Sequence, residues 1–441
     1  MSDPTSPEAE NTGLLHRGVD LWAVISLGLG TAVGVAIFSV IAPATALAGP
    51  GMLLAVLIAA VPMFIIALTY AFMGSALPTS GASFEWSRRF VSPFLGFMIA
   101  WLRIVSNLGA ILILALVLIR YLNMVVPLPT KPAMFVVFLI FWAVNIIGVG
   151  LAGRLQVLMI GAMIALFAVF AAWGAPSITP QAYEPLLPQG WVGVFAAIPL
   201  LIGLFFGLES STEIGDEVKD ARRTIPLGLA LSILAAVVLY LLVAGVTLGV
   251  LGASALGTSD TPLLDAAEVF MGPWAKPLIV TAAVVAIGTS INSLFLGFSR
   301  NLYAMARAGM LPKALLKVHP RTGVPHVALT VILVGATLGL AAPMNLTALF
   351  LAVNIPTLLK YVGVSLSAAV VARRHPEIYE AARFKLSKGA TVFWAYAGTI
   401  MALVVALLGL GADWTPYAAL GVWAILGVGY YLAFIRARGG A

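Results

Sequence analysis

The chain has 441 residues, of which 61% are hydrophobic and 9% are charged, and its mean hydropathy is +1.07. A soluble protein of this length could not bury so much apolar surface in its core. Transmembrane β-strands would alternate apolar and polar residues over about 10 positions. An all-α polytopic membrane protein is therefore predicted. The formal net charge of +7 does not indicate a nucleic-acid partner, because the basic residues stand in short loops between apolar runs, and the lack of cysteine excludes disulfides, thiolate metal sites and thiol catalysis.

Apolar runs follow one another almost from end to end. Residues 1–18 are polar and are expected to form a cytoplasmic tail, since no basic region there leads into an apolar segment and a cleavage site. A spanning helix needs about 20 apolar residues. Runs separated by Gly, Pro and charge clusters predict twelve spans, at residues 20–47, 52–77, 91–123, 133–150, 154–174, 192–214, 226–251, 276–306, 325–342, 346–372, 391–411 and 415–436. The amphipathic loop at 258–274 is predicted to form a short helix over the outer mouth.

The positions of Lys and Arg predict the orientation in the membrane. With the amino terminus inside, nineteen of them fall on the inner side and two, Lys131 and Lys276, on the outer side. Cytoplasmic loops carry an excess of these residues, so both termini are predicted to face the cytoplasm from the cell (inner) membrane. Arg103, Arg120 and Lys360 fall within or near the membrane. Lys360 could pair with a carboxylate, carry a coupling charge or snorkel to the surface, and the sequence does not choose; Arg103 is equally open.

Two spans contain residues that weaken a helix at membrane depth. Gly28, Gly30 and Gly34 interrupt the first span, and Gly203 and Gly207 precede an acid, Glu209, in the sixth. Each glycine costs about 1 kcal/mol relative to alanine in a helix interior. The interruptions lie five spans apart, which is typical of inverted repeats that each begin with a broken helix. The alternative is that small residues only permit close helix packing.

The repeat interpretation divides the chain and predicts a binding site. Residues 19–174 would form the first repeat (spans 1–5), 175–374 the second (spans 6–10), and 375–441 spans 11 and 12 with a tail. Backbone groups unpaired at membrane depth must line a cavity or be buried in protein. N–H groups of the half-helix after Gly34 suit a carboxylate, and carbonyls near 31–33 and 204–206 suit an ammonium group. Together they fit a zwitterionic amino acid.

Three motifs resemble the amino acid–polyamine–organocation (APC) superfamily. They are "GTAVGVAIFSVIAPATALAGPG" in the first span, "FFGLESSTEIGDEVKDARRTIP" in the sixth, and "RNLYAMARAGMLPKALLKVHPRTGVPH" at the inner end of the eighth. The resemblance covers nearly the whole chain and implies a leucine-transporter-type fold of twelve helices with a 5+5 inverted repeat. It also implies secondary transport of amino acids or related amines.

The resemblance and the helix breaks together nominate site residues. The candidate substrate-binding residues are Thr31, Gly34, Val35, Ala36, Asn107, Gly203, Phe205 and Phe206. Glu209 and Lys360 are the candidates for coupling or gating, although Glu209 could simply tie down the broken helix and Asn107 could only make an interhelical hydrogen bond. Thr289 and Ser290 in the eighth span are candidates for a sodium site, although such hydroxyls also bond back to their own helix.

The chain departs from the family pattern in three places. Ala36 stands where the family motif has its second glycine, and Gly203 stands where an aromatic gate is frequent. Many sodium-independent members have a lysine in the fifth span, whereas this chain has Ala162 or Met163 near that position. Coupling through such a lysine is therefore not expected.

Other classes of protein lack support in the sequence. No His-Glu-x-x-His or Gly-x-Ser-x-Gly motif indicates an enzyme, and "GVGLAG" at 148–153 lies at a turn with no strand before it. No cofactor or metal is expected, and the four histidines fall at the cytoplasmic edge. The prediction is a secondary amino acid transporter, proton-coupled or an exchanger, with a polyamine or organic cation carrier and a sodium symporter as alternatives. Spans 11 and 12 are candidates for a homodimer interface.

Overall fold

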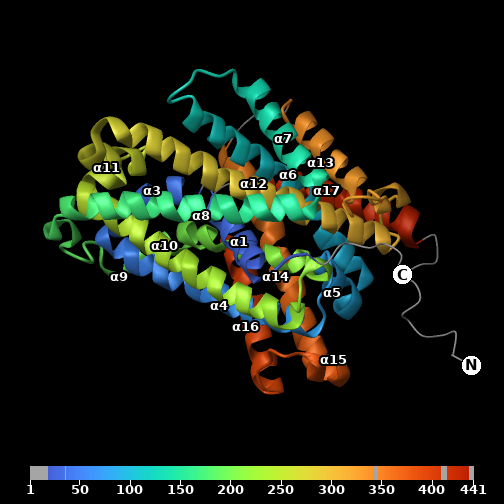
Figure 1. Cartoon of the computed structure of the whole chain (residues 1–441). Coiled ribbons are helices and arrows are strands. Elements are labelled where there is room, and N and C mark those ends of the chain that lie inside the picture. Colours follow the sequence, from blue (N-terminus) through green and yellow to red (C-terminus); the bar gives the residue numbers. More distant parts are fainter. Residues whose placement is uncertain (1–17, 35, 342–345, 409–414, 437–441) are drawn as a thin grey trace, which may run out of the picture.

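The computed structural model describes residues 18–34, 36–341, 346–408 and 415–436 (Figure 1). Over these residues the chain is helical, and its only β-type pairings are two isolated bridges, Val19 with Val218 and Ser80 with Ile214. The helices of the first part are α1 (Leu21–Ala32), α2 (Ala36–Ser39), α3 (Ile41–Ala48), α4 (Met52–Ala76), α5 (Ala82–Trp86), α6 (Pro93–Leu122), α7 (Thr130–Ile147) and α8 (Val149–Gly174). Those of the second part are α9 (Gly190–Leu201), α10 (Ala221–Gly257), α11 (Pro262–Met271), α12 (Ala275–Arg307), α13 (His326–Gly339), α14 (Leu346–Arg374), α15 (Pro376–Ala381), α16 (Lys388–Leu408) and α17 (Thr415–Tyr430).

Ten helical segments among the described residues are long and apolar enough to cross a membrane. Two shorter apolar helices, Leu21–Ala32 and His326–Gly339, lie where the first and ninth spans are predicted. The prediction of an all-α polytopic membrane protein is confirmed at this level, and the twelve-span count and the 5+5 repeat stay predictions. The loop at 258–274 does contain the short helix expected there, α11.

Local sequence explains where several helices begin and end. The side chain of Asp20 caps α1 by accepting the N–H of Ala23 at 2.9 Å. Ser92 caps α6 in the same way, accepting the N–H of Leu95 at 3.0 Å, with a proline at the first helical position. A capping side chain favours a helix start because it accepts a first-turn N–H that has no partner within the helix. Proline at the first position favours it because proline lacks that N–H. Gly252, with φ +74°, interrupts α10 one residue after the predicted end of the seventh span.

Helix α1 lies at the centre of the bundle (Figure 1). It packs against α8, α10 and α12. Polar side chains from all three helices reach its backbone. Gln156 of α8 donates to the carbonyl of Ser26 at 3.1 Å, Ser232 of α10 to that of Ile25 at 3.1 Å, and Thr289 of α12 to that of Gly30 at 3.1 Å. The first broken segment is therefore held from several sides inside protein, which is the setting that irregular backbone at membrane depth requires.

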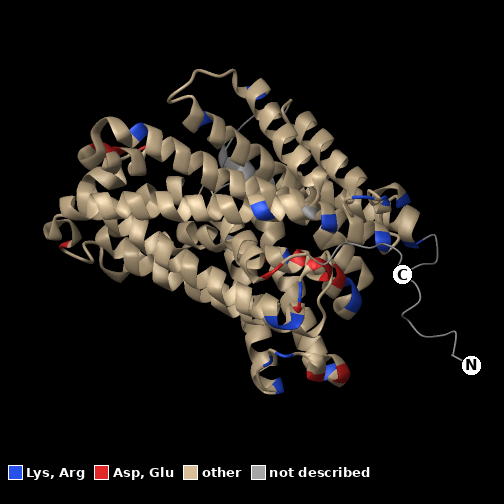
Figure 2. Ribbon diagram, in the orientation of Figure 1, with Lys and Arg blue, Asp and Glu red and all other residues tan. Residues whose placement is uncertain are grey.

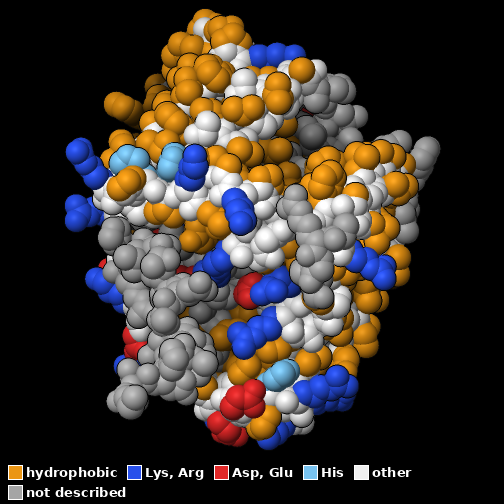
Figure 3. All heavy atoms as spheres, turned by 90° about the vertical axis from the view of Figure 1, so that its right-hand side faces the viewer, with side chains coloured by type: hydrophobic (Ala, Val, Ile, Leu, Met, Phe, Trp, Pro, Cys, Tyr) orange, Lys and Arg blue, Asp and Glu red, His pale blue; other side chains and the backbone are white. Residues whose placement is uncertain are grey.

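Charged side chains are distributed unevenly along the bundle. Lys and Arg gather toward the end at the right and bottom of Figure 2, and fewer lie at the opposite end. Figure 3 looks at the right-hand side, where Lys, Arg and hydrophobic side chains are interspersed. Ion pairs between exposed or half-buried side chains include Arg307 with Asp216 at 3.4 Å and Arg383 with Asp220 at 3.0 Å.

Candidate functional site

The first predicted interruption is present in the structure. Helix α1 ends at Ala32, Val33 has ψ +72°, and α2 begins at Ala36. The N–H of Gly34 donates to the carbonyl of Ala32 at 2.9 Å. Val35, one of the three residues expected to donate to a substrate carboxylate, lies outside the described residues. The carboxylate-binding role of this turn stays a prediction.

The second interruption is also present. Helix α9 ends at Leu201 and continues as the 3-10 helix η5 (Ile202–Phe205), after which Phe206 is extended with ψ +132°. Gly207 follows with φ +98°, a conformation that favours glycine, and the 3-10 helix η6 (Leu208–Glu213) comes next. The apolar helix therefore breaks at the residues that precede Glu209.

The two breaks adjoin each other. A Cβ added to Gly207 would lie 2.4 Å from Cγ2 of Thr31, and one added to Gly28 would lie 2.7 Å from the carbonyl oxygen of Leu208. Both contacts are too short for any side chain larger than hydrogen. Glycine at these two positions thus lets the last turns of α1, just before its break, approach the unwound segment of residues 202–213 closely.

The candidate substrate-binding residues differ in their surroundings. Thr31 and Phe206 are half-buried at the two breaks, and Phe206 lies edge-on to the ring of Tyr361 with centroids 5.9 Å apart. Phe205 is fully buried against Tyr240, whose hydroxyl donates to the carbonyl of Leu204 at 2.6 Å. That carbonyl, one of those expected to receive a substrate ammonium, thus has a protein donor.

The remaining candidates stand on neighbouring elements. A Cβ added to half-buried Gly203 would meet no atom within 4 Å, which agrees with the lack of an aromatic gate at this position. Asn107 is buried on α6, which packs against α12 and α14. Ala36 is half-buried at the start of α2. The substrate-binding roles of these residues stay predictions.

Glu209 and Lys360, named separately from the sequence, form one buried ion pair. Their side chains are 3% and 2% exposed, and the ammonium group of Lys360 donates to Oε1 of Glu209. The other carboxylate oxygen accepts the hydroxyl of Tyr361 at 2.9 Å and the N–H of Gly207 at 3.2 Å. The sequence left open whether Lys360 pairs with a carboxylate, carries a coupling charge or snorkels, and the structure shows that it pairs with a carboxylate. Tyr361 was not predicted.

A second buried pair lies one turn further along the same segment. Arg103 of α6 donates to Oε1 of Glu213 at 3.2 Å, and the hydroxyl of Ser83 donates to the same carboxylate at 2.5 Å. The hydroxyl of Tyr70 lies 3.1 Å from that of Ser83. Glu213 was not predicted as a site residue, although an unexplained cation within a span, Arg103, indicates that a carboxylate partner exists.

A third buried pair joins the segment after η6 to α12. Arg300 is fully buried and donates to Glu217 from Nε at 2.7 Å and from a terminal nitrogen at 3.2 Å. Such a bidentate pair combines specific geometry with charge-assisted hydrogen bonds. The acids of the segment after the second break are thus tied to α14, α6 and α12 in turn.

The candidate cation residues Thr289 and Ser290 contact the first broken helix. Both hydroxyls donate to the carbonyl of Gly30, at 3.1 and 2.5 Å. Each also donates to the carbonyl of Ala286 in its own helix, as isolated hydroxyls in helices do. The structure brings these side chains beside a first-span carbonyl, and their role as sodium ligands stays a prediction.

The fifth-span helix meets α1 through a residue that was not predicted. Gln156 of α8 lies closest to Gly30, where an added Cβ would be 2.1 Å from its Nε2. It also donates to Ser293 at 2.9 Å and accepts from Asn292 at 2.8 Å. A buried amide network therefore stands between α8, α12 and the first break, with Gln156 about two turns before Ala162 and Met163.

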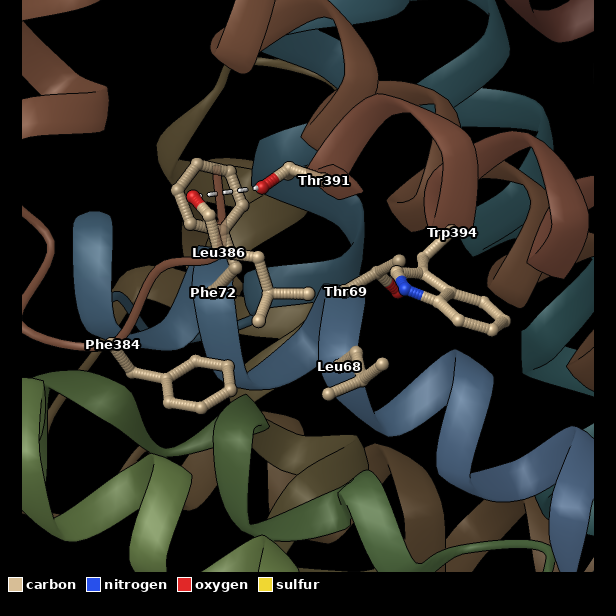
Figure 4. A pocket seen from close by; sticks show the side chains of 7 residues that line it. All are labelled: Leu68, Thr69, Phe72, Phe384, Leu386, Thr391 and Trp394. Atoms are coloured by element: carbon tan, nitrogen blue, oxygen red, sulfur yellow. Dashed lines mark hydrogen bonds between the residues drawn. The ribbon is translucent and has the colours of Figure 1, made fainter. Parts of the chain in front are cut away.

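A separate small pocket lies away from the breaks. It is lined by Leu68, Thr69, Phe72, Phe384, Leu386, Thr391 and Trp394, from α4 and the chain around the start of α16 (Figure 4). Its lining is mostly apolar and shares no residue with the two breaks or with the buried ion pairs. The helix breaks, and not this pocket, carry the candidate site.

The fold and its adjoining breaks define a polytopic helical membrane protein built around two discontinuous helices. The family model described as "Amino acid permease" matches residues 19–429, and the chain belongs to this family. It is therefore a transporter and not an enzyme.

Named relatives align over most of the chain. It is 26% identical to a branched-chain amino acid permease of Bacillus subtilis, over 96% of this chain and 94% of that protein. It is 26% identical to a methylthioribose transporter of the same organism, again over 96% and 94%. It is also 26% identical to a vacuolar cationic amino acid transporter of Arabidopsis thaliana, over 81% of this chain and 60% of that protein. The three relatives are named for different substrates.

Proposed function

We propose that the protein is a secondary active transporter of amino acids that works by alternating access across the cell membrane. The observation that supports this most is the contact between the breaks, where Gly207 lies against Thr31. Broken helices at a repeat interface are where transporters of this kind bind substrate near the bilayer midplane. Backbone of Gly34, Val35 and Ala36 would hold the carboxylate, and carbonyls near Thr31 and Phe205 would hold the ammonium group.

The site residues have assigned roles within this proposal. Thr31, Asn107, Gly203 and Phe206 would line the substrate, with Glu209 and Lys360 in coupling or gating. A buried carboxylate bonded to the N–H of Gly207 is well placed for this role, because a change in its charge acts directly on the break. We propose proton coupling or exchange as the energy source.

The proposal extends to topology and assembly. Both termini would face the cytoplasm, the chain would cross the membrane twelve times in a 5+5 inverted repeat, and the charged end seen in Figure 2 would be cytoplasmic. Helices α16 and α17 have exposed apolar side chains, among them Ile400 and Ile425. They are the candidate surface for a homodimer within the lipid bilayer.

Transport by purified protein in proteoliposomes tests the function. Saturable uptake of a labelled amino acid with counterflow is expected, and an ungated conductance would indicate a channel instead. Competition for uptake of the labelled amino acid distinguishes an amino acid transporter from a polyamine or organic cation carrier. Unlabelled amino acids should compete, and their decarboxylated amines should not. Competition by the amines alone would favour a polyamine or organic cation carrier.

Sodium dependence separates the remaining alternative. Replacing external sodium with choline is expected to leave the initial uptake rate unchanged, because proton coupling or exchange is the proposed energy source. A matched variant, Ser290→Ala, should then also have the same rate in the two salts. A steep fall in the uptake rate of the wild type when sodium is removed, together with no such fall in Ser290→Ala, would establish sodium symport.

A further inference from the structure

Every buried acid among the described residues has a buried or nearly buried cation as its partner. The buried carboxylates are Glu209, Glu213 and Glu217, and none is left without a basic side chain. Their partners are Lys360, Arg103 and Arg300, whose side chains are 2%, 11% and 0% exposed. Isolated charges are strongly disfavoured at this depth. The described core around the breaks is therefore electrically balanced before any substrate enters.

The Glu209–Lys360 pair is the one closest to the break. Glu209 accepts the N–H of Gly207, the residue that contacts Thr31. Tyr361, which also donates to Glu209, has its ring against Phe206. Glu213 and Glu217 lie further along the segment.

Lys360 is held firmly in this position. Its ammonium group lies 4.9 Å from the ring centroid of Tyr361 and 5.9 Å from that of Tyr70, in addition to its ion pair. Aromatic faces stabilise a desolvated cation. The carboxylate bonded to the second break is thus neutralised by the protein and is not available to a cationic substrate side chain.

We infer that Lys360 is a specificity-determining residue, and that by neutralising Glu209 it restricts the site to amino acids with uncharged side chains. This inference rests on the proposed function. A zwitterion with an uncharged side chain brings no net charge into the balanced core. A cationic side chain would bring a charge that none of the buried carboxylates among the described residues is free to match. Sites discriminate strongly when a buried charge is left unpaired.

Ligand-dependent thermal stabilisation of the purified protein tests the inference. Leucine, valine and methionine are the neutral probes, and arginine, lysine and ornithine are the cationic ones. In the wild type the neutral probes are expected to raise Tm at concentrations at least about tenfold lower than the cationic probes do. In Lys360→Met, Glu209 is free to pair with a ligand, so this preference should shift toward the cationic probes by about tenfold or more.

Two further variants complete the design. Lys360→Met combined with Glu209→Gln removes both charges, and it should recover the neutral preference. Lys276→Met removes an exposed lysine in the first turn of α12 and should leave the preference unchanged. If Lys360→Met does not yield folded protein, the wild type and the double variant can still overturn the inference, because both keep the core balanced and both must prefer the neutral probes.

The outcomes are distinguishable from failure of the proposed function. Equal stabilisation by neutral and cationic amino acids in the wild type, or a cationic preference in the double variant, would overturn the inference and leave amino acid transport standing. An unchanged neutral preference in folded Lys360→Met would overturn it too. Stabilisation by no amino acid at all would count against the proposed function itself.

Discussion

Glu209→Gln is expected to lower the initial rate of gradient-driven uptake by about tenfold or more and to flatten its dependence on pH. The amide keeps the shape of the side chain but removes the negative charge, so the ammonium group of Lys360 stays buried without a counterion. Breaking a buried pair in this way costs about 3–5 kcal/mol. The measurement is uptake of labelled substrate into proteoliposomes over a range of pH.

Two companion variants separate coupling from simple structural damage. Asp220→Asn breaks an exposed pair, with Arg383 61% and Asp220 54% exposed, and should change the rate little. Adding Lys360→Met to Glu209→Gln should restore thermal stability but not the pH dependence. Glu209→Gln protein with a normal rate and pH profile would remove the coupling role.

Gly207→Ala is expected to reduce uptake by about ten- to a hundredfold. A non-glycine residue in this region of φ costs on the order of 1–3 kcal/mol. Here φ is +98° and the new Cβ would also lie 2.4 Å from Cγ2 of Thr31, so the second break has to move away from the first. Uptake and thermal stability of the purified variant are the measurements.

The matched control for this variant is Gly161→Ala on α8. An added Cβ there meets no atom within 4 Å, and α8 is helical throughout this region, so stability and uptake should be unchanged. Full activity in Gly207→Ala would mean that the close approach of the two breaks is not required for transport.

Local features of the chain were predictable and long-range pairings were not. The breaks followed from glycines and a carboxylate within apolar runs, which are short-range signals, and the structure places them at Val33 and Phe206–Gly207. The first span escapes a count by helix length because its break leaves α1 with only 12 residues. Among the described residues, the 12-residue α1 and the 14-residue α13 are the two apolar helices at predicted spans that are too short to qualify by length.

The buried ion pairs show why the rest of the site could not be predicted from the sequence. Lys360 and Glu209 are 151 positions apart, and Arg103 and Glu213 are 110 apart. Their pairing depends on which helices lie side by side, and hydrophobic periodicity carries no information on that. Gln156 was missed for the same reason, because its importance comes from facing Gly30 across a helix interface.

Substrate protection of introduced cysteines tests the central claim that the two breaks form one amino acid site. The chain has no cysteine, so Thr31→Cys and Phe206→Cys each carry a single thiol, and Gly161→Cys is the control outside the site. A transported amino acid is expected to slow labelling of both site thiols by a membrane-permeant reagent. Its decarboxylated amine should not slow that labelling, and the amino acid should not slow labelling of the control thiol. Labelling of Thr31→Cys and Phe206→Cys at rates that the transported amino acid does not change would contradict the account.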